Sequence, residues 1–254
     1  MDVQEVTDLR LLDSQGWLLA PNETPEHLFH RKETLEKRRK DFPFSLNAAS
    51  LSKAHEITES LYLFRLKDVP VFCSNKSLPP WEGAVLWTYF DEREAPYPVI
   101  QMRNNYKKGF LRFYKEEEIL AHELVHAARF SFKEPFFEEL FAYKTSKNFF
   151  PRLLGPLFVF RIESLLFVGL VITSFLGFIF LEWTIFLWLP FVFLSYLLVR
   201  LAALHLIVSL AKSYIERSGS KHPLAVLLRL SDKEIWQAAK IRFLLAKKEF
   251  FARF

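Results

Sequence analysis

Residues 115–129 read Lys-Glu-Glu-Glu-Ile-Leu-Ala-His-Glu-Leu-Val-His-Ala-Ala-Arg, without proline or glycine. Three acidic residues, Glu116 to Glu118, lie near the start of this stretch and Arg129 ends it, which matches the charges that helix ends favour, so we predict an α-helix. Residues four apart share one helical face, and His122 and His126 can therefore offer two imidazole nitrogens to one metal ion. Glu123 then lies beside the ion, where its carboxylate can accept a proton from metal-bound water as a general base.

A catalytic zinc site usually has three protein ligands, so a third is expected downstream. The segment Phe136-Phe-Glu-Glu-Leu-Phe-Ala-Tyr143 follows Pro135, a residue suited to the first turn of a helix. A tight helical hairpin would bring this second segment back to the first. Its Glu-Leu-Phe-Ala portion, Glu139 to Ala142, then offers the carboxylate of Glu139.

Together these two motifs resemble those of the gluzincin clan of zinc metallopeptidases, whose aminopeptidases read Asn-Glu-Gly-Phe-Ala around the third ligand. The likeness covers roughly residues 116 to 145. It implies a catalytic Zn²⁺ bound by His122, His126 and Glu139, with Glu123 as the catalytic residue and a peptide or protein as the substrate. The alternative is a catalytically inactive metallopeptidase-like membrane adaptor or scaffold. Retention of Glu123 favours the enzyme, because a purely structural zinc site does not need the base.

Two other residues are candidates for the third ligand. Glu138 is adjacent to Glu139, and neighbouring helical positions diverge by about 100°, so only one of the two can face the metal. Glu216 takes this role if the chain instead resembles the heat-shock and prenyl-processing membrane metalloproteases, in which the hairpin precedes the third ligand. That family carries an Asp four positions later, whereas this chain has Ser220, so we favour Glu139.

Two apolar runs then suggest a membrane anchor. Ser164–Leu181 contains 18 residues without a charge, and Thr184–Val199 contains 16. At 1.5 Å per residue the first run spans about 27 Å, close to the roughly 30 Å of a bilayer's hydrocarbon core. We predict a two-helix transmembrane hairpin, with the second helix continuing past Arg200 and this arginine extending toward the headgroups.

Charges beside the hairpin predict its orientation. Cations lie on both flanks, whereas the connecting turn carries only Glu182, so both termini and the active site are expected in the cytoplasm. The single cysteine, Cys73, permits a reducing compartment, and the first 20 residues lack the apolar segment of a cleavable signal peptide. The flanking cations are Lys144, Lys147, Arg152 and Arg161 before the hairpin and Arg200, Lys212, Arg217 and Lys221 after it.

An α+β fold is expected, with a small zincin-like sheet plus helices, followed by the hairpin and a C-terminal amphipathic helix. Three short runs with strand character precede the metal-binding helix: Val69–Cys73, Ala84–Phe90 and Pro98–Met102. The resemblance implies that the edge strand pairs with an extended substrate, and Pro98–Met102 is the first candidate for this edge, with Ala84–Phe90 the second. Candidates for an oxyanion-stabilising residue are Tyr106, Tyr114 and Tyr143.

Three parts are predicted along the chain: a gluzincin-like metallopeptidase domain at residues 1–150, the transmembrane hairpin at 151–211 and a basic amphipathic helical tail at 212–254. Within the tail, Ser231 and Glu234 form a capping box. The tail helix is expected either to lie on the membrane surface or to pack against the catalytic domain. The net charge of +5 is spread over separate regions and no nucleic-acid motif accompanies it, so lipid is the expected partner and nucleic acid is not.

Overall fold

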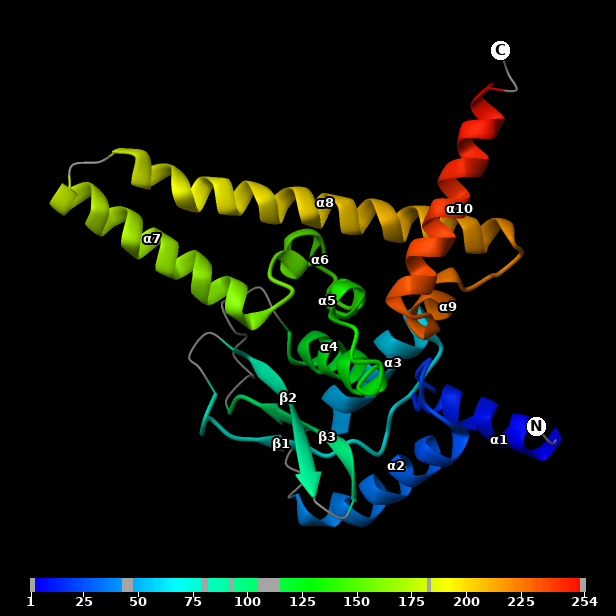
Figure 1. The fold of residues 1–254 in the computed structure, drawn as a ribbon. Helices are drawn as coiled ribbons and strands as arrows, with labels where there is room; N and C mark the ends of the chain where they lie inside the picture. Colours follow the sequence, from blue (N-terminus) through cyan, green and yellow to red (C-terminus); the bar gives the residue numbers. More distant parts are fainter. Residues whose placement is uncertain are drawn as a thin grey trace.

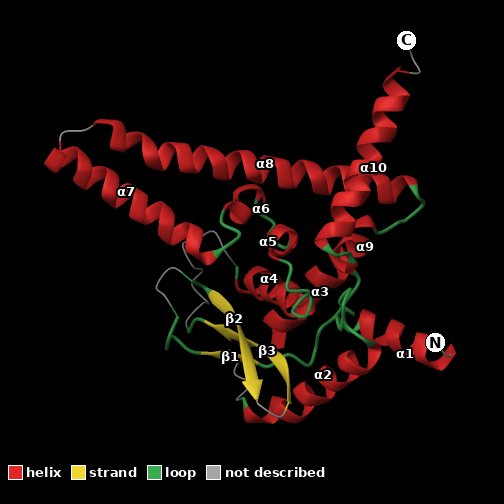
Figure 2. Ribbon diagram, in the orientation of Figure 1, coloured by secondary structure: helices red, strands yellow, loops and turns green. Residues whose placement is uncertain are grey.

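The structure, a computed structural model, describes residues 3–42, 48–78, 82–91, 94–104, 115–181 and 184–251. In that part of the chain it is a mixed α+β protein, in which a small sheet lies at one side of a mainly helical body and two long apolar helices project from this body (Figure 1 and Figure 2). The α-helices are α1 (Val3–Ser14), α2 (Pro25–Arg38), α3 (Ala48–Tyr62), α4 (Glu116–Ala128), α5 (Pro135–Tyr143), α6 (Phe149–Leu154), α7 (Arg161–Leu181), α8 (Trp188–Arg217), α9 (Pro223–Arg229) and α10 (Asp232–Phe251). The 3-10 helices are η1 (Arg39–Asp41), η3 (Gly155–Leu157) and η4 (Thr184–Leu187), and the strands are β1 (Val71–Cys73), β2 (Ala84–Asp91) and β3 (Glu94–Met102).

Strand β3 lies in the middle of the sheet, whose described strands have the order β1-β3-β2. It pairs in parallel with β1 and antiparallel with β2, with Ile100 opposite both Val71 and Leu86. The side chains of Val99 and Ile100 are fully buried, as suits a central strand. The expectation that Pro98–Met102 forms the sheet edge was therefore wrong, because this buried run lies between two partners. The second candidate, Ala84–Phe90, falls in β2, which is an edge strand.

Helix α4 begins at Glu116 and ends at Ala128, as the charges at its two ends predicted. One face is apolar and buried, including Leu120, Leu124 and Val125, and the helix packs on α3, α5 and the sheet. Helix α5 starts with Pro135 at its first turn and lies beside α4, so the two form the tight helical hairpin that the sequence suggested.

The C-terminal elements belong to the same hydrophobic core as the residues around the sheet. In the second half of α8, Leu204, Val208 and Ala211 are buried in this core, so the core extends beyond the predicted boundary at residue 150. Ile235 is buried at the start of α10, which packs across α8. The capping box is formed, with the Ser231 hydroxyl accepting a hydrogen bond from the Glu234 backbone N–H at 3.2 Å.

Arg129 joins this C-terminal region to the α4–α5 hairpin. Its fully buried guanidinium donates hydrogen bonds to the carbonyl oxygens of Leu228 at 2.6 Å and Leu230 at 2.9 Å. Nη2 lies 3.8 Å from a carboxylate oxygen of Glu134 and 3.7 Å from one of Asp232. Asp232 also accepts a hydrogen bond from the backbone N–H of Phe136, in the first turn of α5. The start of α5 is thus tied to α9 and α10 through a buried charge network.

Replacing Arg129 with methionine should lower the free energy of unfolding by about 3 kcal/mol, because it leaves the buried carboxylate of Asp232 and the partly exposed one of Glu134 without their cation. Chemical denaturation in detergent micelles measures this loss. Arg65→Gln provides the control, since Arg65 and its partner Glu59 form an exposed ion pair worth less than about 1 kcal/mol. An equal loss for both variants would contradict the structural role of Arg129.

Among the described residues, two helices are long and apolar enough to cross a membrane, one spanning Ile162–Phe180 and the other lying within Thr184–Arg217. They project side by side from the body in Figure 1. Large apolar side chains such as Phe180 and Val199 are exposed along the projecting parts. At the base, Arg200 forms an ion pair with Glu163.

Candidate metal centre

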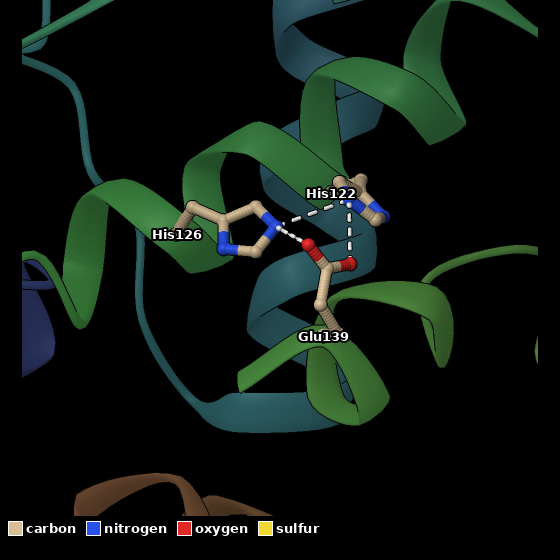
Figure 3. A group of neighbouring side chains, drawn as sticks. All are labelled: His122, His126 and Glu139. Atoms are coloured by element: carbon tan, nitrogen blue, oxygen red, sulfur yellow. Dashed lines mark hydrogen bonds and ion pairs between the residues drawn. The ribbon is translucent and has the colours of Figure 1, made fainter. Parts of the chain in front are cut away.

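The two histidines of α4 and one glutamate of α5 converge on a common point, as Figure 3 shows. The Nε2 atoms of His122 and His126 are 3.1 Å apart. Glu139 directs one carboxylate oxygen to each of them, with Oε2 3.7 Å from His122 Nε2 and Oε1 3.6 Å from His126 Nε2. The structure therefore brings together the three residues that were predicted as metal ligands.

These separations fit a zinc ion. With ligand bonds of about 2.0–2.2 Å, a tetrahedral ion holds its ligand atoms roughly 3.4 Å apart. The two Nε2 atoms are 3.1 Å apart, and each lies 3.6 or 3.7 Å from the nearer oxygen of Glu139. Two imidazole nitrogens and a carboxylate oxygen are also donors that Zn²⁺ accepts. Three protein ligands leave a fourth position for water, as in catalytic zinc sites.

Glu138 contacts His126 on the side of the ring that faces away from His122 and Glu139. The Nδ1 atom of His126 lies 2.6 Å from Glu138 Oε1, so Nδ1–H donates to this carboxylate and Nε2 is the ring nitrogen that faces the site. Sequence reasoning treated Glu138 only as a rival of Glu139. Neighbouring helical positions point in different directions, which places Glu139 at the candidate ligand position and Glu138 behind the imidazole of His126. The Glu-Glu pair was therefore the sequence signal that could have revealed the role of Glu138.

Burial and charge act differently on the two histidines. Burial, together with the nearby charge of His126, lowers the pKa of His122 well below its usual value. Burial also lowers the pKa of His126, but the carboxylates of Glu139 and Glu138 outweigh it and raise this pKa to about 10. Without a metal ion the site thus holds a proton on His126, which an incoming cation has to displace.

Glu123 is buried on the same helix and lines a cleft of about 940 Å³. Burial raises its pKa to about 7; the positive charge of His126 opposes this, and nearby carboxylates including that of Glu139 add to it. A general base works best when its pKa lies near the working pH. The position and pKa of Glu123 therefore suit the role predicted for it.

The edge strand β2 forms one wall of this cleft. The carbonyl oxygen of Gly83 accepts a hydrogen bond from the Arg103 N–H at 2.9 Å, so the backbone groups of Gly83 point inward to β3. Because these groups alternate along a strand, those of Ala84, Leu86 and Thr88 point outward. Nothing in the described ranges pairs as a strand with this outer edge.

The other predicted candidates lie in different places. Glu216 is on α8, outside the cleft, and its carboxylate contacts Lys212 at 3.4 Å. Tyr143 lines the cleft, and its ring centroid is 4.6 Å from that of His122. Tyr106 and Tyr114 fall outside the described residues.

Comparisons with protein-family models, with curated proteins and with solved structures found no match to this chain. The chemistry of the site has to be inferred from its donor atoms, its cleft and its charges.

Proposed function

We propose that this protein is a membrane-anchored, zinc-dependent peptidase of the gluzincin type. The observation that carries the proposal is the convergence of His122, His126 and Glu139 next to a buried Glu123 in a cleft. Metal binding without catalysis would require only the three ligands. A carboxylate with its pKa raised to about 7 beside them is what hydrolysis additionally requires.

A zinc ion bound by these ligands would supply Lewis acidity and lower the pKa of a water molecule to about 7. Glu123 would take a proton from that water as it attacks the peptide carbonyl, and would then deliver the proton to the leaving amine. Glu138 would hold His126 in the tautomer that ligation needs. Tyr143 is the described candidate for stabilising the oxyanion, because it lines the cleft beside His122.

The edge of β2 supports a peptide as the substrate. Outward backbone groups at Ala84, Leu86 and Thr88 can hydrogen-bond an extended chain, which would add to the sheet as one more strand along the cleft. Such recognition reads the peptide backbone and therefore accepts many side chains. A protein segment in an extended conformation is the expected substrate.

Zinc content and peptide cleavage test this proposal directly. Purified protein should contain close to one zinc per chain, and it should cleave members of a fluorogenic peptide library. A zinc chelator should stop cleavage and added zinc should restore it, whereas His126→Ala should purify without the metal. Equal zinc in His126→Ala and wild type would exclude this site. Zinc-loaded wild-type protein that cleaves no peptide would favour a catalytically inactive adaptor or scaffold.

We further propose that α7 and the first half of α8 cross a membrane as a hairpin. The exposed apolar surface of both helices supports this, and the second half of α8, which packs in the core, would hold the catalytic body against the bilayer. Cations flank both ends of the hairpin, whereas its turn has none, and such asymmetry keeps the flanks in the cytoplasm.

This orientation predicts a specific labelling pattern in intact cells. Tags at residues 1 and 254 should be protected from added protease, because both termini would be cytoplasmic. A cysteine introduced at position 182 in a Cys73→Ser background should react with an impermeant thiol reagent. Cleavage of the tags without labelling at position 182 would invert the orientation and place Glu123 on the opposite side of the membrane.

A further inference from the structure

Helix α6 presents large apolar side chains to the outside of the protein. Phe149 and Phe150 are 68% and 73% exposed, and Leu153 and Leu154 on the same helix are exposed as well. Such a cluster on a six-residue helix is costly in water, since it buries little of its own apolar surface. An apolar partner for this helix is therefore expected.

The helix lies at the base of the projecting hairpin, between α7 and α8 in Figure 1. Two contacts fix α6 and the following turn η3 in this position. The Leu153 carbonyl oxygen accepts a hydrogen bond from His205 Nε2 at 3.0 Å, and the Leu157 carbonyl oxygen accepts one from Arg200 Nη2 at 2.9 Å. Both donors belong to α8, at the point where its exposed apolar half ends. A bilayer that surrounds the hairpin would consequently reach α6.

Three cations gather beside α6: Lys144 at the end of α5, Arg152 on α6 and Lys212 on α8. Helix α5 packs against both α6 and α8, which brings the three cations together. Burial and the positive charges of Arg152 and Lys212 lower the pKa of Lys144. Lys212 contacts Glu216, whereas neither Lys144 nor Arg152 forms an ion pair with another described residue. The cluster thus keeps a net positive charge next to an apolar surface, a combination that complements an anionic lipid interface.

We propose that α6 and these three cations bind the surface of an anionic phospholipid bilayer. Phe149 and Phe150 enter the interface, and Lys144, Arg152 and Lys212 contact lipid phosphates. This inference rests on insertion of the hairpin as proposed above. Binding of α6 to the bilayer places the cleft at the membrane surface, because Thr145, next to Lys144, lines the cleft. The accessible peptide bonds would then be those close to a membrane.

Depth-dependent fluorescence quenching of the full chain in lipid nanodiscs tests the position of α6. Single cysteines in a Cys73→Ser background would carry an environment-sensitive fluorophore at Phe150, at Val168 on α7 or at Leu11 on α1. Val168 and Leu11 are similarly exposed, at 53% and 57%. We expect nitroxides near the headgroups to quench the probe at Phe150, deep nitroxides to quench that at Val168, and neither to quench that at Leu11.

The three probes separate the possible failures. If the probe at Val168 is quenched but the probe at Phe150 is as unquenched as that at Leu11, the α6 inference is overturned and the hairpin anchor stays intact. Absence of quenching at Val168 would overturn the anchor and the inference together. If α6 instead packs against a second copy of the protein, the probe at Phe150 would show quenching between labelled protein molecules and no quenching by lipid nitroxides. This result would equally overturn the inference.

Lipid charge tests the cation cluster. Two samples are compared, one with the nitroxide on phosphatidylglycerol, which is anionic, and one with it on phosphatidylcholine. The probe at Phe150 should be quenched several-fold more in the first. Combined replacement of Lys144, Arg152 and Lys212 by glutamine should remove this preference, whereas the same change at the exposed cations Lys53, Arg65 and Lys67 should keep it. Equal quenching by both lipids in wild type would exclude the headgroup site. Loss of the preference on adding inorganic phosphate would instead assign the cluster to a soluble anion.

Discussion

Glu123→Gln should bind zinc as tightly as the wild-type protein and yet lose about two to four orders of magnitude in kcat. The side chains that converge as candidate metal ligands are His122, His126 and Glu139, so removing the charge of Glu123 leaves the proposed donor set unchanged. Glutamine has nearly the same shape as glutamate but cannot accept a proton from water. Metal analysis and peptide cleavage on the same preparation measure the two properties separately.

Glu117→Gln is the matched control for this variant, because Glu117 lies on the same helix but is not among the residues that line the cleft. It should retain both zinc and activity.

The pH dependence of activity gives an independent check on the role of Glu123 as the base. Glu123 works as a carboxylate, so activity should fall as the pH drops through its pKa, which is about 7 before a cation binds and lower once a positive charge is adjacent. Activity that persists in Glu123→Gln would require another base.

The convergence of His122, His126 and Glu139 could be predicted from the sequence because it depends on local geometry. The spacing of His122 and His126 fixes their relation on any α-helix, and Pro135 marks the start of the second helix. Predicting that Glu139 lies beside the two histidines required only that the two helices form a hairpin, which their short connection imposes. The role of Glu138 could not be derived in the same way, because it depends on the orientation of the His126 ring.

Properties that depend on distant partners were predicted less well. Pro98–Met102 and Ala84–Phe90 both read as strands, and the sequence could not show which one has two neighbours. The apolar residues after Arg200 posed a similar problem, since a helix facing lipid and a helix facing a protein core have the same composition. In the structure Leu204 and Val208 pack in the core, which the sequence alone did not reveal.

Removing the third ligand should have the largest effect on metal affinity among the three candidate glutamates. Glu139→Ala deletes a carboxylate whose oxygens approach both histidines, so zinc affinity should fall by more than about 100-fold. Glu138→Ala acts only through His126 and should cost about 10–100-fold. Glu216→Ala should have no effect, because this residue pairs with Lys212 outside the cleft. Competition with a chromophoric zinc chelator measures all three affinities.

Glu138→Gln sharpens this comparison between a direct ligand and a residue that orients one. The glutamine carbonyl oxygen can still accept the hydrogen bond from His126 Nδ1, so the imidazole keeps its orientation and only the negative charge is lost. Zinc affinity should therefore lie between those of Glu138→Ala and wild type. If Glu138→Ala weakened binding more than Glu139→Ala, Glu138 would be the ligand and Glu139 the supporting residue. A dominant effect of Glu216→Ala would instead require α8 to approach the metal, which its packing in the core opposes.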